Sequence, residues 1–177
     1  MTCIVGIAHN NKVYIGGDSA GVSGLDIIIR KDKKVFRRGP FLIGFTSSFR
    51  MGQLLNHKLD VPERKPGEDV MEFMVTTFVD SVRECFKDGG YTRVSDSRET
   101  GGSFLVGYEK RLFHIESDFQ VGEAISGYDA CGCGTPYALG SLRNSTKLSP
   151  LKRLEQALET AAEFSAGVAP PFFFEEM

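Results

Sequence analysis

Extended apolar runs open the chain, and a polar break divides them. Residues 3–9 and 13–18 are rich in Ile and Val, and Asn10-Asn11-Lys12 lies between them. Short apolar runs bounded by turn residues predict a hairpin of two mostly buried strands. Another buried strand is predicted at 41–45, directly after the turn signal Gly39-Pro40.

Apolar residues at helical spacing follow these strands. A first helix is predicted over about residues 48–58. A second is expected to start near Pro66, because proline and the acids that follow it are favourable in the first turn of a helix. Its apolar stripe ends at Gly89-Gly90 and consists of Val70, Phe73, Met74, Phe78, Val82 and Cys85. This face is expected to pack against a sheet.

The second half of the chain repeats the order of strands and then helices. A hairpin is predicted over 103–108 and 112–116, and a third extended stretch over 119–130. A short helix is expected after the turn 132–137, and Ser149-Pro150 predicts the start of a longer one. The last strand is predicted at Phe172-Phe-Phe174.

Other segments have no clear pattern. Residues 20–26 are small and glycine-bearing and 91–102 are polar, so both are expected to be loops. Ile27-Ile28-Ile29 is too short to assign. Helices grouped between groups of strands, rather than alternating with them, predict an α+β fold with two antiparallel sheets and helices outside them. No repeat, linker or low-complexity segment divides the chain, so 1–177 is expected to be one domain.

Composition excludes several classes of function. The 177 residues are 41% hydrophobic and 25% charged, with a formal net charge of −2, so nucleic acid is not an expected partner. No apolar run approaches the ~20 residues that span a bilayer, and no secretory signal is expected, because no positively charged segment precedes a hydrophobic one. The expected location is therefore cytoplasmic, with no membrane partner.

The cysteines predict neither disulfides nor a metal site. Cys3, Cys85, Cys131 and Cys133 do not form a disulfide framework in a chain of this size, and all four are expected to be reduced. Cys131-Gly-Cys133 has no second cysteine pair to complete a zinc site. No metal is expected.

Thr2, Asp18 and Lys34 are the candidates for chemistry. If Met1 is removed, Thr2 carries a free α-amine beside its hydroxyl, and an amine with a pKa of about 8 can activate a hydroxyl nucleophile. A nearby lysine would favour the neutral amine and steady the developing charge, and a carboxylate would orient that lysine. Each residue also has an ordinary alternative: a threonine after Met1 is common, Asp18 suits a turn, and the basic run around Lys34 suits a solvated face.

Several stretches match one known family in order and spacing. They are Thr2-Cys-Ile-Val-Gly, Gly16-Gly-Asp18-Ser, Lys33-Lys34-Val35, Ile43-Gly-Phe45, Gly132-Cys-Gly-Thr-Pro-Tyr-Ala138 and Ala157-Leu-Glu-Thr-Ala-Ala162. With them the sequence resembles proteasome β-type subunits and, most closely, the bacterial HslV-type peptidases among the N-terminal nucleophile hydrolases. The resemblance spans almost the whole chain and implies a four-layer α/β/β/α sandwich.

The resemblance also implies roles for individual residues. Thr2 matches the nucleophile, Asp18 the aspartate and Lys34 the lysine of the family. Ser47 lies near the glycine whose N–H belongs to the oxyanion hole, although the alignment slips there by about one residue. Two matches depart from the pattern: Cys133 replaces a serine that organises the amine, and Glu163 replaces an aspartate. A second serine is replaced by Ala166, next to Ser165.

The function implied is that of a threonine-type peptidase that cleaves unfolded polypeptide. Family members form homo-oligomeric rings, to which a separate ATPase ring feeds substrate, and no bound cofactor is required. Methionine aminopeptidase is expected to expose Thr2, because threonine is small. Two alternatives stay open: a non-catalytic subunit that only assembles, and an amidohydrolase that acts on small amides.

Overall fold

Two antiparallel sheets form the centre of the protein. We describe it from a computed structural model that covers all residues, Met1–Met177. The first sheet has the strand order β12-β1-β2-β13. Its strands are β1 (Cys3–His9), β2 (Lys12–Gly17), β12 (Tyr128–Gly132) and β13 (Phe173–Glu176).

The second sheet has the order β11-β10-β9-β6-β5. Its strands are β5 (Val35–Arg38), β6 (Phe41–Phe45), β9 (Phe104–Tyr108), β10 (Arg111–Ile115) and β11 (Val121–Gly122). The hairpins predicted at the start of the chain and at 103–116 are therefore confirmed. The predicted stretch 119–130 is instead divided: β11 pairs with β10 in this sheet, whereas β12 crosses to pair with β1 in the other.

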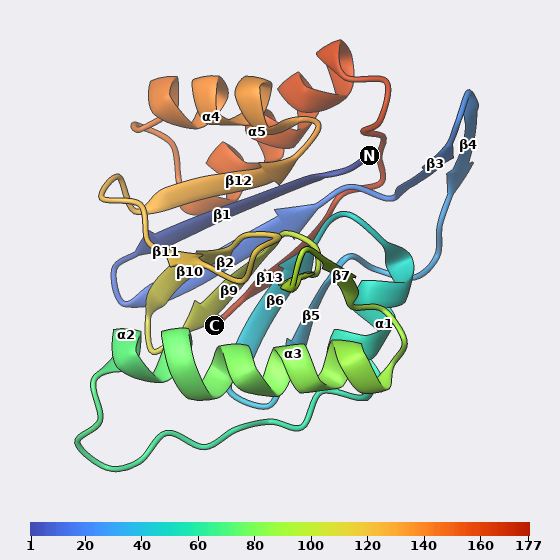
Figure 1. The fold of residues 1–177 in the computed structure, drawn as a ribbon. Helices are drawn as coiled ribbons and strands as arrows, with labels where there is room; N and C mark the ends of the chain where they lie inside the picture. The colour runs from blue at the N-terminus through green and yellow to red at the C-terminus, as the bar shows by residue number, and fades with distance from the viewer.

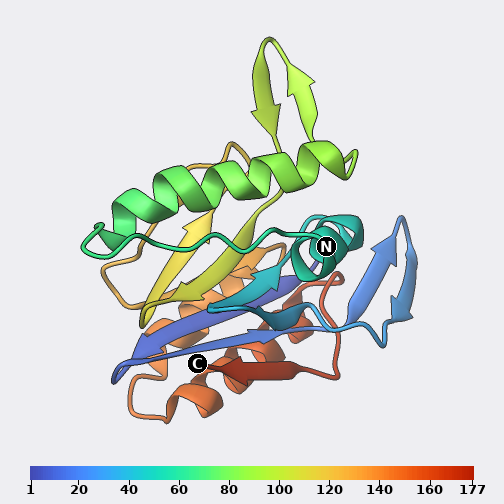
Figure 2. The same ribbon diagram turned by 90° about the horizontal axis from the view of Figure 1, so that it is seen from below.

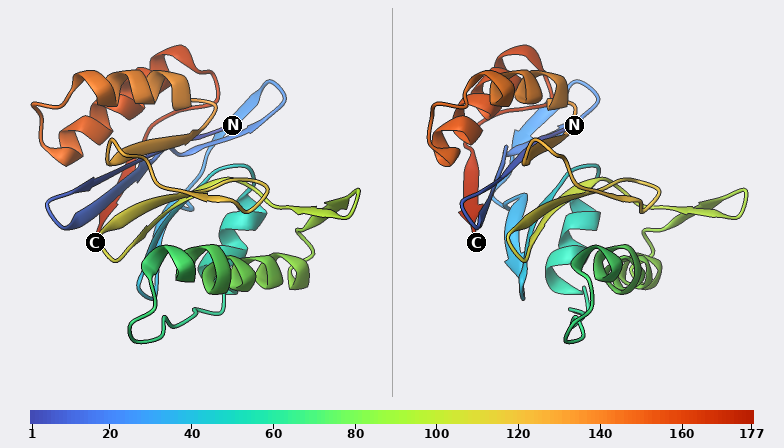
Figure 3. Two further views of the ribbon diagram at one scale, coloured as in Figure 1. Left: turned by 60° about the vertical axis from the view of Figure 1, so that its left-hand side comes forward. Right: turned by 90° about the vertical axis from the view of Figure 1, so that its left-hand side faces the viewer.

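Helices cover the outer face of each sheet, as Figures 1 and 3 show. On the first sheet lie α4 (Thr135–Asn144) and α5 (Pro150–Phe164). On the second lie α1 (Phe49–His57) and a long helix made of α2 (Val70–Phe73), a π-helical turn (Met74–Phe78) and α3 (Val79–Asp88). The α+β class and the four-layer α/β/β/α sandwich are thus confirmed.

Three apolar clusters fill the three spaces between these layers. The largest joins α1 and α3 to the second sheet through residues such as Phe41, Phe78 and Phe104. A second joins α4 and α5 to the first sheet, around Leu154 and Leu158. A third, with Ile4, Ile15 and Leu105, lies between the sheets. Burial of each large apolar side chain contributes about 1.5–3 kcal/mol, so this packing fixes the distance between the sheets.

The helix starts follow their capping residues. Ser48 caps α1, its hydroxyl accepting from the Arg50 N–H at 3.1 Å. Asp69, rather than a residue near Pro66, caps the second helix: its carboxylate accepts from two N–H groups of the first turn. Gly67 has a φ of +81° in a turn before the helix, so the expected start at Pro66 was too early.

Two further hairpins form, one over 20–29, where a loop was expected at 20–26 and 27–29 was left unassigned, and one in the expected loop 91–102. β3 (Ala20–Ser23) pairs with β4 (Asp26–Ile29), and β7 (Arg93–Ser95) pairs with β8 (Arg98–Thr100). Both extend away from the sandwich, as Figure 2 shows. Most residues of these hairpins are exposed or only partly buried, so they show little inside–outside alternation and the hydrophobic pattern could not reveal them.

The remaining differences are small. The last strand, β13, begins at Phe173 and runs to Glu176, one residue later than the predicted start. No helix combines the length and apolar character that crossing a membrane requires.

Candidate active site

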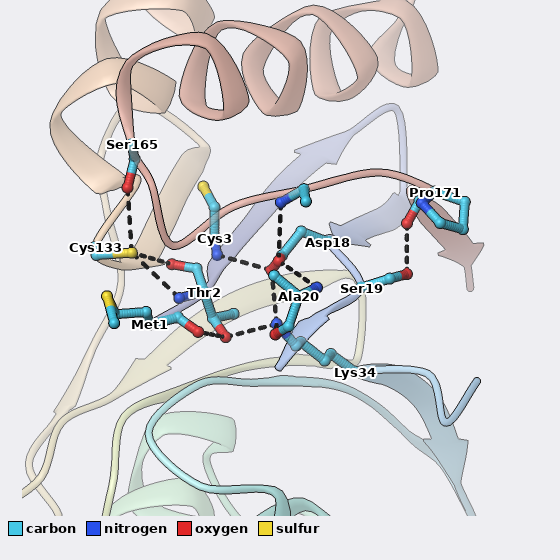
Figure 4. A network of polar contacts seen from close by, with 11 residues as sticks. Met1, Thr2, Cys3, Asp18, Ser19, Ala20, Lys34, Cys133, Ser165 and Pro171 are labelled. Atoms are coloured by element: carbon cyan, nitrogen blue, oxygen red, sulfur yellow. Dashed lines mark hydrogen bonds and ion pairs between the residues drawn. The ribbon is translucent and has the colours of Figure 1, made fainter. Parts of the chain in front are cut away.

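A buried lysine joins the start of the chain to the end of its first hairpin. Lys34 Nζ lies 2.7 Å from Thr2 Oγ1 and 2.9 Å from Asp18 Oδ1, and it also donates to the Ala20 carbonyl at 2.7 Å (Figure 4). The Lys34 and Asp18 side chains are 1% and 0% exposed. Because the neighbouring Lys31 and Lys33 are exposed, the solvated-face alternative holds for them and is wrong for Lys34.

Backbone N–H groups hold Asp18 in place. Its Oδ1 accepts from the Cys3 N–H at 3.0 Å, and its Oδ2 accepts from the Ala20 N–H at 2.9 Å and the Ala169 N–H at 3.4 Å. These donors come from three separate segments of the chain (Figure 4). Asp18 is therefore a structural junction as well as the partner of the lysine, and it is not a simple turn residue.

The environment of Lys34 disfavours its charge. Burial lowers the pKa of Lys34 below its usual value of 10.5, and the charge and hydrogen bond of Asp18 oppose this effect without cancelling it. A lysine whose pKa is lowered, in contact with a hydroxyl, can exchange a proton with it more readily than an exposed lysine can.

The backbone of Thr2 lies against the end of β12. Its N–H donates to Cys133 Sγ at 3.2 Å, and the Cys133 thiol lies 3.4 Å from the Thr2 carbonyl. Gly132 has a φ of +103°, and a Cβ there would lie 2.2 Å from the Thr2 oxygen, so only glycine permits this approach. The end of β12 thus fixes where Thr2 begins β1.

Met1 occupies the position in front of Thr2. Its side chain is half exposed, and the Thr2 hydroxyl donates to the Met1 carbonyl. In this form the Thr2 nitrogen belongs to a peptide bond, so it has no basic lone pair. An amine base therefore arises only when the bond between Met1 and Thr2 is cut.

Ser47 has a backbone conformation that glycine adopts more readily than other residues. Its φ of +61° lies in the left-handed region that favours glycine, which fits its match to the family's glycine. The N–H groups of Thr46 and Ser48 donate to backbone carbonyls, whereas the Ser47 N–H takes part in no such bond. It is thus free to donate to a substrate.

A cavity of about 250 Å³ connects Ser47 with Thr2. The hairpin β3–β4 forms one wall with Val22, Asp26 and Ile28, and the turn after β6 forms the other. Thr2 and Lys34 lie in the lining between the walls.

The structure does not bring Glu163 into this network. Glu163 is exposed near the end of α5 and makes none of the site's hydrogen bonds, and Ala166 is exposed as well. Ser165 is instead the residue that reaches the site: its hydroxyl donates to Cys133 Sγ at 3.3 Å. The resemblance placed the family's serine at position 166, one residue after Ser165. Residues beyond the end of a helix follow no periodic pattern, so the sequence could not correct this offset.

The other cysteines lie in the core. Burial raises the pKa of Cys3 to about 12 and raises that of Cys131 well above its usual value. Cys131 packs between the sheets whereas Cys133 lies beside Thr2, so the two do not face a common ion. All four cysteines are free thiols in the structure.

Comparison with known proteins gives the class. No protein-family model matches the chain. It is 28% identical over 167 residues to the ATP-dependent protease subunit HslV of Caldicellulosiruptor saccharolyticus. The aligned region covers 91% of this chain and 89% of the HslV chain.

Solved structures show the same fold. Thiobacillus denitrificans BPH in complex with epoxomicin superposes with a TM-score of 0.81 at 20% identity, over 99% of this chain and 98% of that one. The eukaryotic HslV of Trypanosoma brucei gives 0.69 at 17% identity, over 99% and 98%.

The fold is therefore that of the proteasome-like N-terminal nucleophile hydrolases. In sequence the chain is similar to HslV, and this confirms the resemblance found in the sequence.

Proposed function

We propose that the protein is a threonine-type peptidase that hydrolyses unfolded polypeptide, with Thr2 as nucleophile once Met1 has been removed. The contact between Lys34 Nζ and Thr2 Oγ1 at 2.7 Å carries this proposal. A lysine that is 1% exposed and paired with a carboxylate has no surface role to explain it.

The reaction is an acyl transfer in two steps. The free α-amine of Thr2 takes the hydroxyl proton as Oγ1 attacks the peptide carbonyl, and Lys34 stabilises the charge on that oxygen. The Ser47 N–H donates to the oxyanion of the tetrahedral intermediate. The leaving amine receives the proton, and water then hydrolyses the Thr2 ester by the same route.

Asp18 and Cys133 orient these groups. Asp18 holds Lys34 against the Thr2 hydroxyl. Cys133 accepts a hydrogen bond from the Thr2 nitrogen, and the Ser165 hydroxyl in turn bonds to Cys133 Sγ. Glu163 makes no contact with these groups and has no part in the proposed mechanism. The mechanism needs no cofactor or metal.

The assembly follows from the same relationship. HslV is named an ATP-dependent protease subunit, so we propose a cytoplasmic homo-oligomeric ring that works with a separate ATPase ring. Such a ring would select unfolded chains by access rather than by sequence.

Cleavage of unfolded casein tests the substrate class. We expect a chain that begins at Thr2 to degrade casein to short peptides, with native globular proteins left intact. Peptide products on a gel and by mass spectrometry are the readout. Hydrolysis of small amides alone would favour the amidohydrolase alternative, and no hydrolysis of either would favour the non-catalytic subunit.

Cys133 favours the non-catalytic alternative most, because a thiol makes only weak hydrogen bonds to an amine. If the site is active, Cys133→Ser should preserve kcat or raise it up to about tenfold, since a hydroxyl holds the amine better by about 1 kcal/mol. Cys85→Ser, in the core far from the site, is the matched control for the substitution itself. A hundredfold fall in kcat for Cys133→Ser alone would contradict the orienting role.

A further inference from the structure

A serine, a histidine and an aspartate lie in hydrogen-bonded order outside the network of Lys34. Ser103 Oγ lies 2.8 Å from His114 Nε2, and His114 Nδ1 lies 3.1 Å from Asp129 Oδ2. The side chains of His114 and Asp129 are 16% and 23% exposed. A polar chain in such a setting is strong only when every member is paired, as it is here.

The hydrogen bonds of Ser103, His114 and Asp129 connect the two sheets. His114 belongs to β10 of the second sheet, and Asp129 belongs to β12 of the first. Elsewhere the space between the sheets is filled by apolar residues. Three residues after Asp129, β12 ends at Gly132, which contacts the Thr2 carbonyl. The aspartate therefore lies on the strand that positions the nucleophile.

Ser103, at the other end of this hydrogen-bonded series, holds the turn that contains Ser47. The Ser103 carbonyl accepts from the Thr46 N–H at 3.2 Å and from the Thr46 hydroxyl at 2.9 Å. The Ser103 N–H donates to Ser47 Oγ at 3.1 Å. Ser103 thus bonds both to Thr46 and to Ser47, and Ser47 lines the substrate cavity.

We infer that Ser103, His114 and Asp129 are positioning residues, which fix the distance between the strand that holds Thr2 and the turn that supplies the oxyanion donor. The inference rests on the proposed function for its catalytic consequence, but not for the connection itself. A donor at Ser47 is useful only within about 2.7–3.1 Å of the oxyanion, so a small shift of the turn lowers transition-state stabilisation.

The charges around His114 support a stable connection. Burial lowers the pKa of His114, but the hydrogen bond and charge of Asp129 and the charge of Glu116 outweigh this, so the pKa lies above 6.5. Glu116 Oε1 is 3.5 Å from Nε2. In either charge state His114 keeps a partner on each nitrogen, donating through Nδ1 to Asp129.

Ser103→Ala tests this inference, because it removes the hydroxyl and leaves the backbone bonds to Thr46 and Ser47. We expect kcat on a peptide substrate to fall about tenfold, a partial loss of one oxyanion donor, with KM unchanged. Hydrogen exchange of the segment 46–48 should become faster. Ser103→Thr, which restores a hydroxyl, should recover kcat to within about threefold of the wild type.

Ser126→Ala is the matched control. It also removes one serine hydroxyl, which bonds only to the Tyr128 carbonyl in an exposed loop, so neither kcat nor exchange at 46–48 should change. Wild-type kcat and wild-type exchange in Ser103→Ala would overturn the inference. So would faster exchange spread over the whole protein, because that marks general destabilisation.

Failure of the proposed function gives a different result. If the wild type with Thr2 exposed hydrolyses nothing, the peptidase proposal falls, and exchange at 46–48 still decides whether Ser103 holds the turn. Faster exchange confined to that segment supports the connection, and unchanged exchange overturns it.

Discussion

Replacing Lys34 by methionine is expected to lower the free energy of unfolding by about 3–5 kcal/mol, because the Asp18 carboxylate is then buried without its charged partner. The same change removes the group that contacts Thr2 Oγ1, so hydrolysis should slow by about 10²–10⁴-fold. Chemical denaturation and the kinetics of casein cleavage measure the two effects separately.

Lys33→Met is the matched control for this prediction. Lys33 is the adjacent lysine, but it is half exposed and pairs with Glu175 at 3.7 Å, where an ion pair contributes at most about 1 kcal/mol. Equal losses in the free energy of unfolding for Lys34→Met and Lys33→Met would contradict a stabilising role for the buried pair of Lys34 and Asp18. Wild-type turnover in Lys34→Met would exclude Lys34 from the mechanism even if stability fell as expected.

Thr2→Ala is expected to abolish hydrolysis. In a chain that begins at residue 2, the alanine keeps the α-amine but removes the hydroxyl that attacks. The loss should be on the order of 10⁶-fold, as for other hydrolases that lose a hydroxyl nucleophile. Thr2 is 4% exposed and its hydroxyl contacts only Lys34 and Met1, so the free energy of unfolding should change little.

Thr2→Ser separates the nucleophile from the shape of the side chain. Serine keeps the hydroxyl and loses one methyl group, so we expect cleavage to fall by no more than about tenfold. Residual cleavage in Thr2→Ala equal to that in Thr2→Ser would show that the reaction occurs elsewhere, for example at another serine or at Cys133.

The parts of the fold with an apolar face could be predicted from the sequence. The stripe from Phe73 to Cys85 predicted a helix on a sheet, and the runs around Ile4 and Ile43 predicted buried strands, because burial imposes a period on the pattern. The hairpin β7–β8 lacks that pattern. Its turn has two residues with positive φ, Asp96 and Ser97, which are weaker signals than glycine.

The core of the site was predictable for a different reason. Thr2, Asp18 and Lys34 lie close together in sequence and meet through the first strands of the fold, so a match in register places all three. Residues that reach the site from distant segments were harder to find. Ser165 and the Ala169 N–H meet Cys133 and Asp18 only because the segment after α5 passes beside them.

The network of Ser103, His114 and Asp129 could not be predicted at all. His114 is far from the other histidines in the sequence, and its neighbours match neither the spacing of metal ligands nor that of a catalytic motif. Its partners come from the start of β9 and from β12 in the opposite sheet, so only the packing of the two sheets brings them together.

The central claim is that Thr2 becomes a nucleophile when its own amine is free. The most direct test is intact-mass spectrometry of preparations whose casein cleavage is measured in parallel. One chain is released from a cleavable fusion so that Thr2 comes first, and the other retains Met1. We predict that cleavage scales with the fraction of chains that begin at Thr2 and that chains with Met1 are inactive. Equal cleavage by both preparations would contradict the account.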